Sequence, residues 1–479
     1  MAKNRIRITA FFILSAMLAA MSACGGESVP AADESTDSTS APETEELIPL
    51  PEADYGGETV NVFLWQNAEI DVTEENGEVL NDAIFRRNQT IEEQYNFTFS
   101  FTTAEGSGGN YGTWLDTLSS SIMAGDDSIQ LAGGYGYRLS ADSLNGNFAN
   151  LLDTPIDFTA EWWPQNLVEA GNLGGAMYIC FGNLDTDFYS RIQVIHFNKQ
   201  LAIDYGVTDV YDLVREGKWT LDKLIEYSSK AGKDLNGDSK MTELDQFGYI
   251  TQPNMDIDGF LNSCHLKFTE LDENGLPVML PLPERYLTVF EKIKSFARES
   301  DFTFYDRNSK LTPTIFSEGR ALFAPFQLRS TNTLREMEAD FGILPYPKFD
   351  EAQDGYGTPL SVGNCSAYMI PQTADKDMVG TILEAMAYYG WRDVMPEYKE
   401  ITLKVKGTRD DESAEMLDII FAATRFDFTS FYSFAFGDQS APGMLLRQCI
   451  KNNKDMASSW ASSQSLFDKT LTKLIDALK

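Results

Sequence analysis

The chain has 479 residues, which is too many for one small hydrophobic core and favours two domains. It is 43% hydrophobic and carries 38 Lys and Arg against 72 Asp and Glu, a formal net charge of -34. A surface this acidic repels phosphate backbones, so the composition argues against a nucleic-acid-binding protein.

The first 23 residues have the pattern of an export signal. Basic residues precede an apolar run over residues 8–21, and this run is shorter than the roughly 20 residues that a membrane-spanning helix needs. Small residues then lead to Cys24, in a pattern that resembles the lipobox of bacterial lipoproteins, where the cysteine is lipid-modified and becomes the new N-terminus. Met21 stands where that signal usually has leucine, and an ordinary cleaved signal with an incidental cysteine is the alternative.

Residues 24–54 are expected to be the lipidated cysteine and a disordered acidic tether. Residues 25–50 are rich in Gly, Ser, Thr, Pro, Ala and acidic residues and contain no Lys or Arg, so they cannot bury enough apolar surface to offset the entropy of ordering. Signal, cysteine and tether together predict a folded body held at the outer face of a membrane.

The folded body is predicted to open with a βαβ unit. Residues 59–65 form an apolar run typical of a buried strand. A helix pattern follows, with apolar residues from Leu80 to Tyr95 on one face, and residues 97–101 then alternate Phe with Thr and Ser as a strand does. This order predicts a mainly parallel sheet and an α/β fold of two lobes.

Further helices are expected to begin at Thr220, which is a candidate N-cap, and over residues 413–421 and 458–478. His196 lies in a strand-like run and is interpreted as a core histidine. The cysteines after Cys24 have no CxxC spacing and apolar surroundings, which favours buried thiols over disulfides or a metal site.

Residues 234–245 match the spacing of an EF-hand-like calcium loop. Oxygen-bearing side chains at loop positions 1, 3, 5 and 12 would converge on one ion, with a backbone carbonyl and a hydroxyl between them. The predicted ligands are Asp234, Asn236, Asp238, Lys240, Thr242 and Asp245. Ser239 replaces the usual glycine and Asp245 the usual glutamate, and a solvated polar turn is the alternative. We expect such an ion to be structural.

The chain resembles the extracellular solute-binding proteins of family 1, the carbohydrate-binding lipoproteins of ABC importers. The resemblance covers nearly all of residues 55–479 and rests on the order and spacing of short motifs. These are Asp82–Asn88, Met123–Asp127, Met177–Tyr178, Val194–Lys199, Gly217–Thr220, Phe316–Phe323 and Phe341–Lys348.

This resemblance implies a type II periplasmic-binding-protein fold, with two α/β lobes, crossing hinge strands and an interlobe cleft. Crossings are expected near 178–183, 322–326 and 363–369. Lobe 1 would then comprise 55–178 with 324–364, and lobe 2 would comprise 179–323 with 365–479. The implied protein is a monomer that captures a sugar or oligosaccharide and delivers it to the permease subunits of an ABC importer, attached to the membrane through its lipid only.

Sugar binding needs hydrogen-bonding groups beside aromatic rings, because sugars present both hydroxyls and apolar C–H faces. Residues of both kinds follow the first strand, a second short strand and two of the expected crossings, and each aromatic among them has a core residue as its alternative interpretation. The predicted ligand-binding residues are Trp65, Gln66, Asn67, Tyr135, Tyr137, Asn183, Asp185, Phe326 and Gln327.

No catalytic residue is predicted. The sequence has no GxSxG, Walker loop or HExxH motif, and an excess of carboxylates by itself does not identify a hydrolase pair. A surface lipoprotein that only adheres to glycans and a secreted glycoside hydrolase are the alternative functions.

Overall fold

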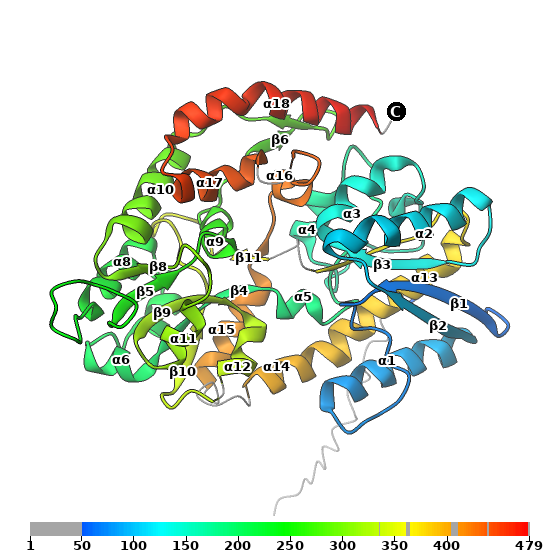
Figure 1. The fold of residues 1–479 in the computed structure, drawn as a ribbon. Helices are drawn as coiled ribbons and strands as arrows, with labels where there is room; N and C mark the ends of the chain where they lie inside the picture. The colour runs from blue at the N-terminus through cyan, green and yellow to red at the C-terminus, as the bar shows by residue number, and fades with distance from the viewer. Residues whose placement is uncertain (1–49, 335, 361–364, 404–410, 438–439, 478–479) are drawn as a thin grey trace, which may run out of the picture. The chain divides into compact units, whose positions relative to one another are not determined.

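The computed structural model describes residues 50–479 except for 335, 361–364, 404–410, 438–439 and 478–479 (Figure 1). The predicted signal, Cys24 and the tether up to residue 49 lie outside the described residues. In the part of the chain that is described, no helix is both long and apolar enough to cross a membrane.

The predicted βαβ unit is present. Strand β1 (Glu58–Trp65) pairs in parallel with β2 (Phe97–Ala104), and helix α1 (Val79–Tyr95) connects them. The apolar side of α1 is buried, and the helix ends at Asn96, whose left-handed φ of 52° stops the helical backbone. Local sequence periodicity was therefore sufficient to place these three elements.

Sheet 1 has four strands in the order β12-β3-β1-β2. Strand β3 (Leu131–Tyr135) is parallel to β1, whereas β12 (Ser366–Met369) is antiparallel to β3. Gly133 makes this close pairing possible, because a Cβ there would lie 2.6 Å from the Tyr368 ring and 2.7 Å from Leu64.

Sheet 2 has five strands in the order β10-β4-β9-β5-β8. At its centre β9 (Ala321–Gln327) runs antiparallel to β4 (Gln193–Asn198) and parallel to β5 (Phe247–Thr251). Strand β10 (Phe341–Leu344) adds to β4, and β8 (Thr303–Tyr305) adds to β5. Every residue of β4 and β5 is buried, as expected for strands covered on both faces.

The other helices and short strands surround the two sheets (Figure 1). The helices are α2 (Tyr111–Ala124), α3 (Gly136–Asp142), α4 (Gln165–Gly171), α5 (Asp187–Ser190), α6 (Lys199–Asp204), α7 (Val210–Arg215), α8 (Leu221–Ala231), α9 (Met255–Ser263), α10 (Glu284–Lys294), α11 (Thr312–Ser317), α12 (Thr331–Leu334), α13 (Lys376–Tyr389), α14 (Met395–Leu403), α15 (Asp411–Ala422), α16 (Phe428–Phe431), α17 (Leu445–Asn452) and α18 (Met456–Asp476). The remaining strands are β6 (Thr269–Leu271), β7 (Pro277–Met279), β11 (Thr358–Pro359) and β13 (Thr424–Arg425).

Several local predictions are confirmed. The Thr220 hydroxyl accepts a hydrogen bond from the Lys223 N–H and caps α8. Helix α15 contains the predicted residues 413–421, and α18 contains the predicted helix over 458–476. His196 is fully buried in β4, where burial lowers its pKa to about 3 and its Nε2 lies 3.1 Å from the Thr331 hydroxyl. Cys180, Cys264, Cys365 and Cys449 are buried, and none of them forms a disulfide with another described cysteine.

The strand pairing differs from the expected lobe boundaries. Residues 324–327 and 341–344 belong to sheet 2, although 324–364 was assigned to lobe 1, and β12 belongs to sheet 1 although 365–479 was assigned to lobe 2. Residues 322–326 are therefore a central strand of sheet 2 and not a crossing. The sheet to which each of these strands belongs is determined by antiparallel pairing between distant segments, and local sequence patterns do not predict such pairing.

One described segment connects the sheets. Cys180 bridges Tyr368 of β12 and Ile192 bridges Leu360, both in antiparallel orientation, so residues 180–192 run from sheet 1 to the start of β4 in sheet 2. We call residues 180–192 the crossing segment; the crossing expected near 178–183 falls at its start, whereas the one expected near 363–369 includes residues outside the described part of the chain. A further passage is helical: α13 continues through a π-helical turn (Gly390–Val394) into α14, which contacts both α1 and α15.

Trp162 and Trp163, which precede α4, are both buried. Their side chains are only 7% and 1% exposed. Each indole N–H donates to one oxygen of the buried Glu384 carboxylate, at 3.0 and 2.9 Å, so a polar partner on α13 allows both rings to be buried.

Candidate functional site

Three of the predicted ligand-binding residues meet where β1 and β3 end. The Trp65 and Tyr135 rings stack with centroids 5.1 Å apart, and Tyr137 follows at 5.9 Å from Tyr135. Tyr111 lies 6.4 Å from Tyr135, and Phe434 lies 5.9 Å from Tyr137. We call these five residues the strand-end cluster; it stands at the carboxyl ends of parallel strands, where open α/β sheets bind ligands.

Polar groups stand directly beside this cluster. The Gln66 amide donates to the Ser107 hydroxyl at 2.8 Å and accepts from the Gly106 N–H at 2.7 Å, which fixes the turn after β1. Asn67, the next residue, is exposed. Hydrogen-bonding groups next to stacked rings are the combination that a sugar requires.

A buried chain of hydrogen bonds connects the strand-end cluster to the crossing segment. The Trp65 indole donates to the Ser366 hydroxyl at 2.8 Å, and that hydroxyl donates to Asp187 Oδ2, also at 2.8 Å. Burial raises the pKa of Asp187 well above its usual range, and the neighbouring carboxylates of Asp185 and Glu69 add to this rise. Trp65 is therefore held in one orientation by the start of β12 and by α5.

Asp185 lies two residues before Asp187, the last residue of this chain of hydrogen bonds, and is 3% exposed. Its Oδ2 accepts hydrogen bonds from the Tyr368 hydroxyl and from the Glu69 N–H, and its Oδ1 accepts from the Asp187 N–H. With both oxygens occupied, its position indicates that it fixes the crossing segment against sheet 1.

The remaining predicted residues lie elsewhere. Phe326 packs in the core of sheet 2 between His196 and Phe316, and we therefore interpret it as a core residue. Gln327 ends β9 opposite Gln193. Asn183 donates a hydrogen bond to the Trp162 carbonyl and lines a separate cavity.

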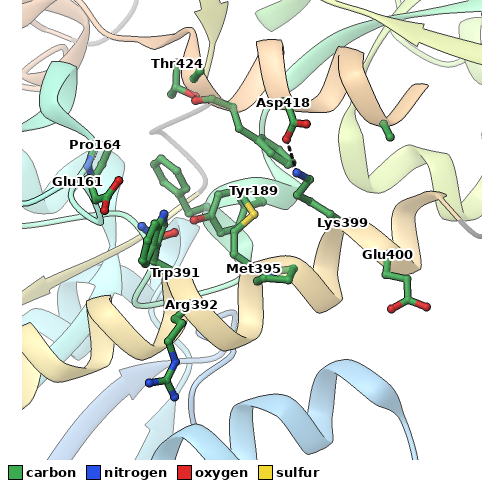
Figure 2. A pocket seen from close by; sticks show the side chains of 16 residues that line it. Glu161, Pro164, Tyr189, Trp391, Arg392, Met395, Lys399, Glu400, Asp418 and Thr424 are labelled. Atoms are coloured by element: carbon green, nitrogen blue, oxygen red, sulfur yellow. Dashed lines mark hydrogen bonds and ion pairs between the residues drawn. The ribbon is translucent and has the colours of Figure 1, made fainter. Parts of the chain in front are cut away.

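That cavity has a volume of about 780 Å³ and lies between the crossing segment, α14 and α15 (Figure 2). Its apolar wall includes Tyr189, Trp391 and Met395, and an ion pair between Lys399 of α14 and Asp418 of α15 lies at its side. We call it the hinge cavity. Local sequence patterns did not predict this cavity, because its walls come from segments far apart in the chain.

The loop over 234–245 has part of the expected geometry. Ser239, at the position where EF-hands have glycine, adopts a left-handed φ of 63°. Asp234 accepts hydrogen bonds from the Gly237 and Ser239 N–H groups, and Asp245 accepts from Leu235 and Thr242. Among the described residues, however, no three Asp, Glu, His or Cys side chains form a group that could hold a metal ion.

Comparisons with known proteins identify the class of fold. No family model and no curated protein sequence matches the chain. Among solved structures, a cyclo/maltodextrin-binding protein complexed with maltotetraose has a TM-score of 0.59 at 11% identity, covering 87% of this chain and 99% of that one. The sugar-binding protein MalE of Xanthomonas citri has a TM-score of 0.57 at 10% identity, covering 87% and 98%.

The ABC substrate-binding protein Lmo0181 of Listeria monocytogenes, in complex with cycloalternan, has a TM-score of 0.54 at 11% identity and covers 87% and 99%. The chain therefore has the two-lobed α/β fold of the binding proteins of ABC transporters, which confirms the predicted fold class. Sheets 1 and 2 are the cores of the two lobes.

Proposed function

We propose that the protein is the solute-binding subunit of an ABC importer, which captures a sugar or oligosaccharide between its lobes and delivers it to the permease subunits. The observation that carries this proposal is the strand-end cluster, in which stacked rings stand beside amide and hydroxyl groups in a fold shared with sugar-binding proteins. Binding and release require no catalytic group.

The export signal and Cys24 support attachment of the mature protein to the outer face of the cell membrane by a lipid alone. A folded body that ends in a long tether can reach a permease in the same membrane. Replacing Cys24 by serine should release the protein from the membrane fraction while leaving its ligand binding unchanged.

We also propose that residues 234–245 bind a structural calcium ion. The left-handed backbone at Ser239 and the oxygen-rich spacing support it. The loop would then stabilise the second lobe, since it precedes β5 of sheet 2.

Isothermal titration calorimetry against a panel of mono- and oligosaccharides tests the function. A Tyr137→Ala variant should weaken binding of the recognised glycan by about fivefold or more, because a ring that stacks on a sugar contributes on the order of 1 kcal/mol or more. Tyr305→Ala, at the edge of sheet 2, is the matched control and should bind as the parent does.

The outcomes separate the candidate functions. Ligand-dependent compaction in solution scattering supports capture in a closing cleft, and binding without compaction favours a glycan adhesin. Release of shorter sugars would identify a hydrolase. If Trp391→Ala weakens binding and Tyr137→Ala does not, the sugar occupies the hinge cavity and our assignment of the site is wrong.

A further inference from the structure

Three arginines in the described part of the chain have guanidinium groups over aromatic rings, and two of them have an acceptor as well. Arg392 lies over Tyr389 and donates to both oxygens of Asp393, at 2.6 and 2.7 Å. Arg285 lies over Phe349 and donates to the Gln353 side chain at 3.0 Å.

Arg138 differs from these two. Its guanidinium carbon lies 4.2 Å from the centroid of Tyr111 and 4.5 Å from that of Phe434, so two rings of the strand-end cluster cover it. Its Nε is buried without a hydrogen-bond partner, and no carboxylate among the described residues lies within 4 Å of its nitrogens. Asp142, one helical turn later, accepts the Tyr111 hydroxyl at 2.6 Å instead.

The chemistry of guanidinium defines what is missing at this position. Its N–H donors all lie in the plane of the group, and its faces are occupied by the two rings. The acceptor that fits the free edge is planar and takes two parallel hydrogen bonds, which describes a carboxylate.

We propose that Arg138 binds a carboxylate of the ligand, so that the captured solute is an acidic sugar or oligosaccharide, such as one that contains uronic acid residues. This rests on the proposed function and adds the class of substrate to it. The rings of Tyr137 and Tyr135 continue from Arg138 toward Trp65, so a sugar whose carboxylate meets Arg138 has aromatic faces beside it on which to stack.

Matched ligands test the proposal with the full chain. Oligogalacturonides and their methyl esters have the same rings and linkages and differ in the carboxylate charge; the corresponding pairs of glucuronate and mannuronate oligomers extend the panel. We expect one acid form to bind about tenfold to a hundredfold tighter than its ester, as a charge-assisted bidentate pair predicts. The preference should decrease as salt is added, because the pair is only partly buried.

Two substitutions at one position separate binding from structure. Arg138→Gln should abolish the preference for the acid form, and Arg138→Lys should retain part of it, because lysine keeps the charge but not the bidentate edge. Arg392→Gln removes an arginine that already has its own carboxylate and should leave the preference unchanged.

Each result is decisive. Equal binding of acid and ester, or preference for neutral glycans, overturns the inference while the sugar-binding function stands. An equal loss of both ligand forms in Arg138→Gln indicates a structural arginine and also overturns it. If no neutral or acidic glycan binds, the proposed function fails as well.

Discussion

Replacing Glu384 by glutamine should change how the stability of the protein depends on pH. Glu384 is 2% exposed and accepts the indole N–H groups of Trp162 and Trp163. Burial raises the pKa of its carboxyl from 4.5 to about 7, although the two indole hydrogen bonds act in the opposite direction.

Proton linkage determines whether the free energy of unfolding rises or falls with pH. A carboxyl with a higher pKa in the folded state than in the unfolded state holds its proton more tightly when folded. Its full contribution to stability is present below pH 4.5 and is lost as the pH rises to 7 and above. One pKa unit corresponds to about 1.4 kcal/mol, so the free energy of unfolding should fall by about 3 kcal/mol over this range.

Glutamine cannot ionise, and it offers one acceptor oxygen where glutamate offers two. At pH 5 we expect Glu384→Gln to be less stable than the parent by about 1–2 kcal/mol, the cost of leaving one buried indole N–H without an acceptor. At pH 8 ionisation of Glu384 has lowered the free energy of unfolding of the parent by more than this cost. The two stability curves should therefore cross, and the variant should be as stable as the parent or more stable.

Urea unfolding at pH 5, 6, 7 and 8, followed by near-ultraviolet circular dichroism, measures this difference. His196, whose low pKa destabilises the folded state as the pH falls from 6.5 toward 3, is common to both proteins and cancels in the comparison. Asp377→Asn, an exposed acid on the same helix, controls for net charge. A difference between parent and Glu384→Gln that does not change with pH would refute the reasoning.

The remaining predictions concern packing and metal binding. Gly248→Ala should destabilise the fold by about 3 kcal/mol or more, measured by thermal melting, because a Cβ there would lie 1.7 Å from the Ser228 carbonyl oxygen where α8 packs on β5; Gly109→Ala, with no neighbouring atom within 4 Å, should have little effect. Calcium at a hundred times its dissociation constant should raise the free energy of unfolding by about 2.7 kcal/mol, and Asp234→Asn should reduce the gain. A melting temperature unchanged by calcium or by a chelator would instead show that residues 234–245 are an ordinary turn.

Local patterns in the sequence predicted the elements that are stabilised locally. The βαβ unit, the Thr220 cap and the buried strand around His196 each depend on neighbouring residues or on simple periodicity, and each is present. The prediction also brought together Trp65, Tyr135 and Tyr137, whose rings lie side by side because they follow neighbouring parallel strands; that they bind a ligand stays a prediction.

Contacts between distant segments were not predictable in this way. Nothing near Trp65 indicates that Ser366 will accept its indole hydrogen bond, and nothing near Arg138 indicates that Phe434 will cover it. The burial of Trp162 and Trp163 is a further example, since it depends on Glu384, more than 200 residues further along the chain.

The late arrival of β10 and β12 bears on how the chain reaches its fold. Strand β3 is complete at residue 135, but one of its edges remains unpaired until residues 366–369 have been synthesised. One edge of β4 likewise remains unpaired until residues 341–344 have been synthesised. A ribosome makes about 230 further residues between the two halves of the β3–β12 ladder. Neither lobe can therefore mature as the chain emerges, and unpaired strand edges must be kept from other chains during synthesis. Long-range pairing of this kind is slow, so the nascent chain remains without its complete native sheets for most of its synthesis.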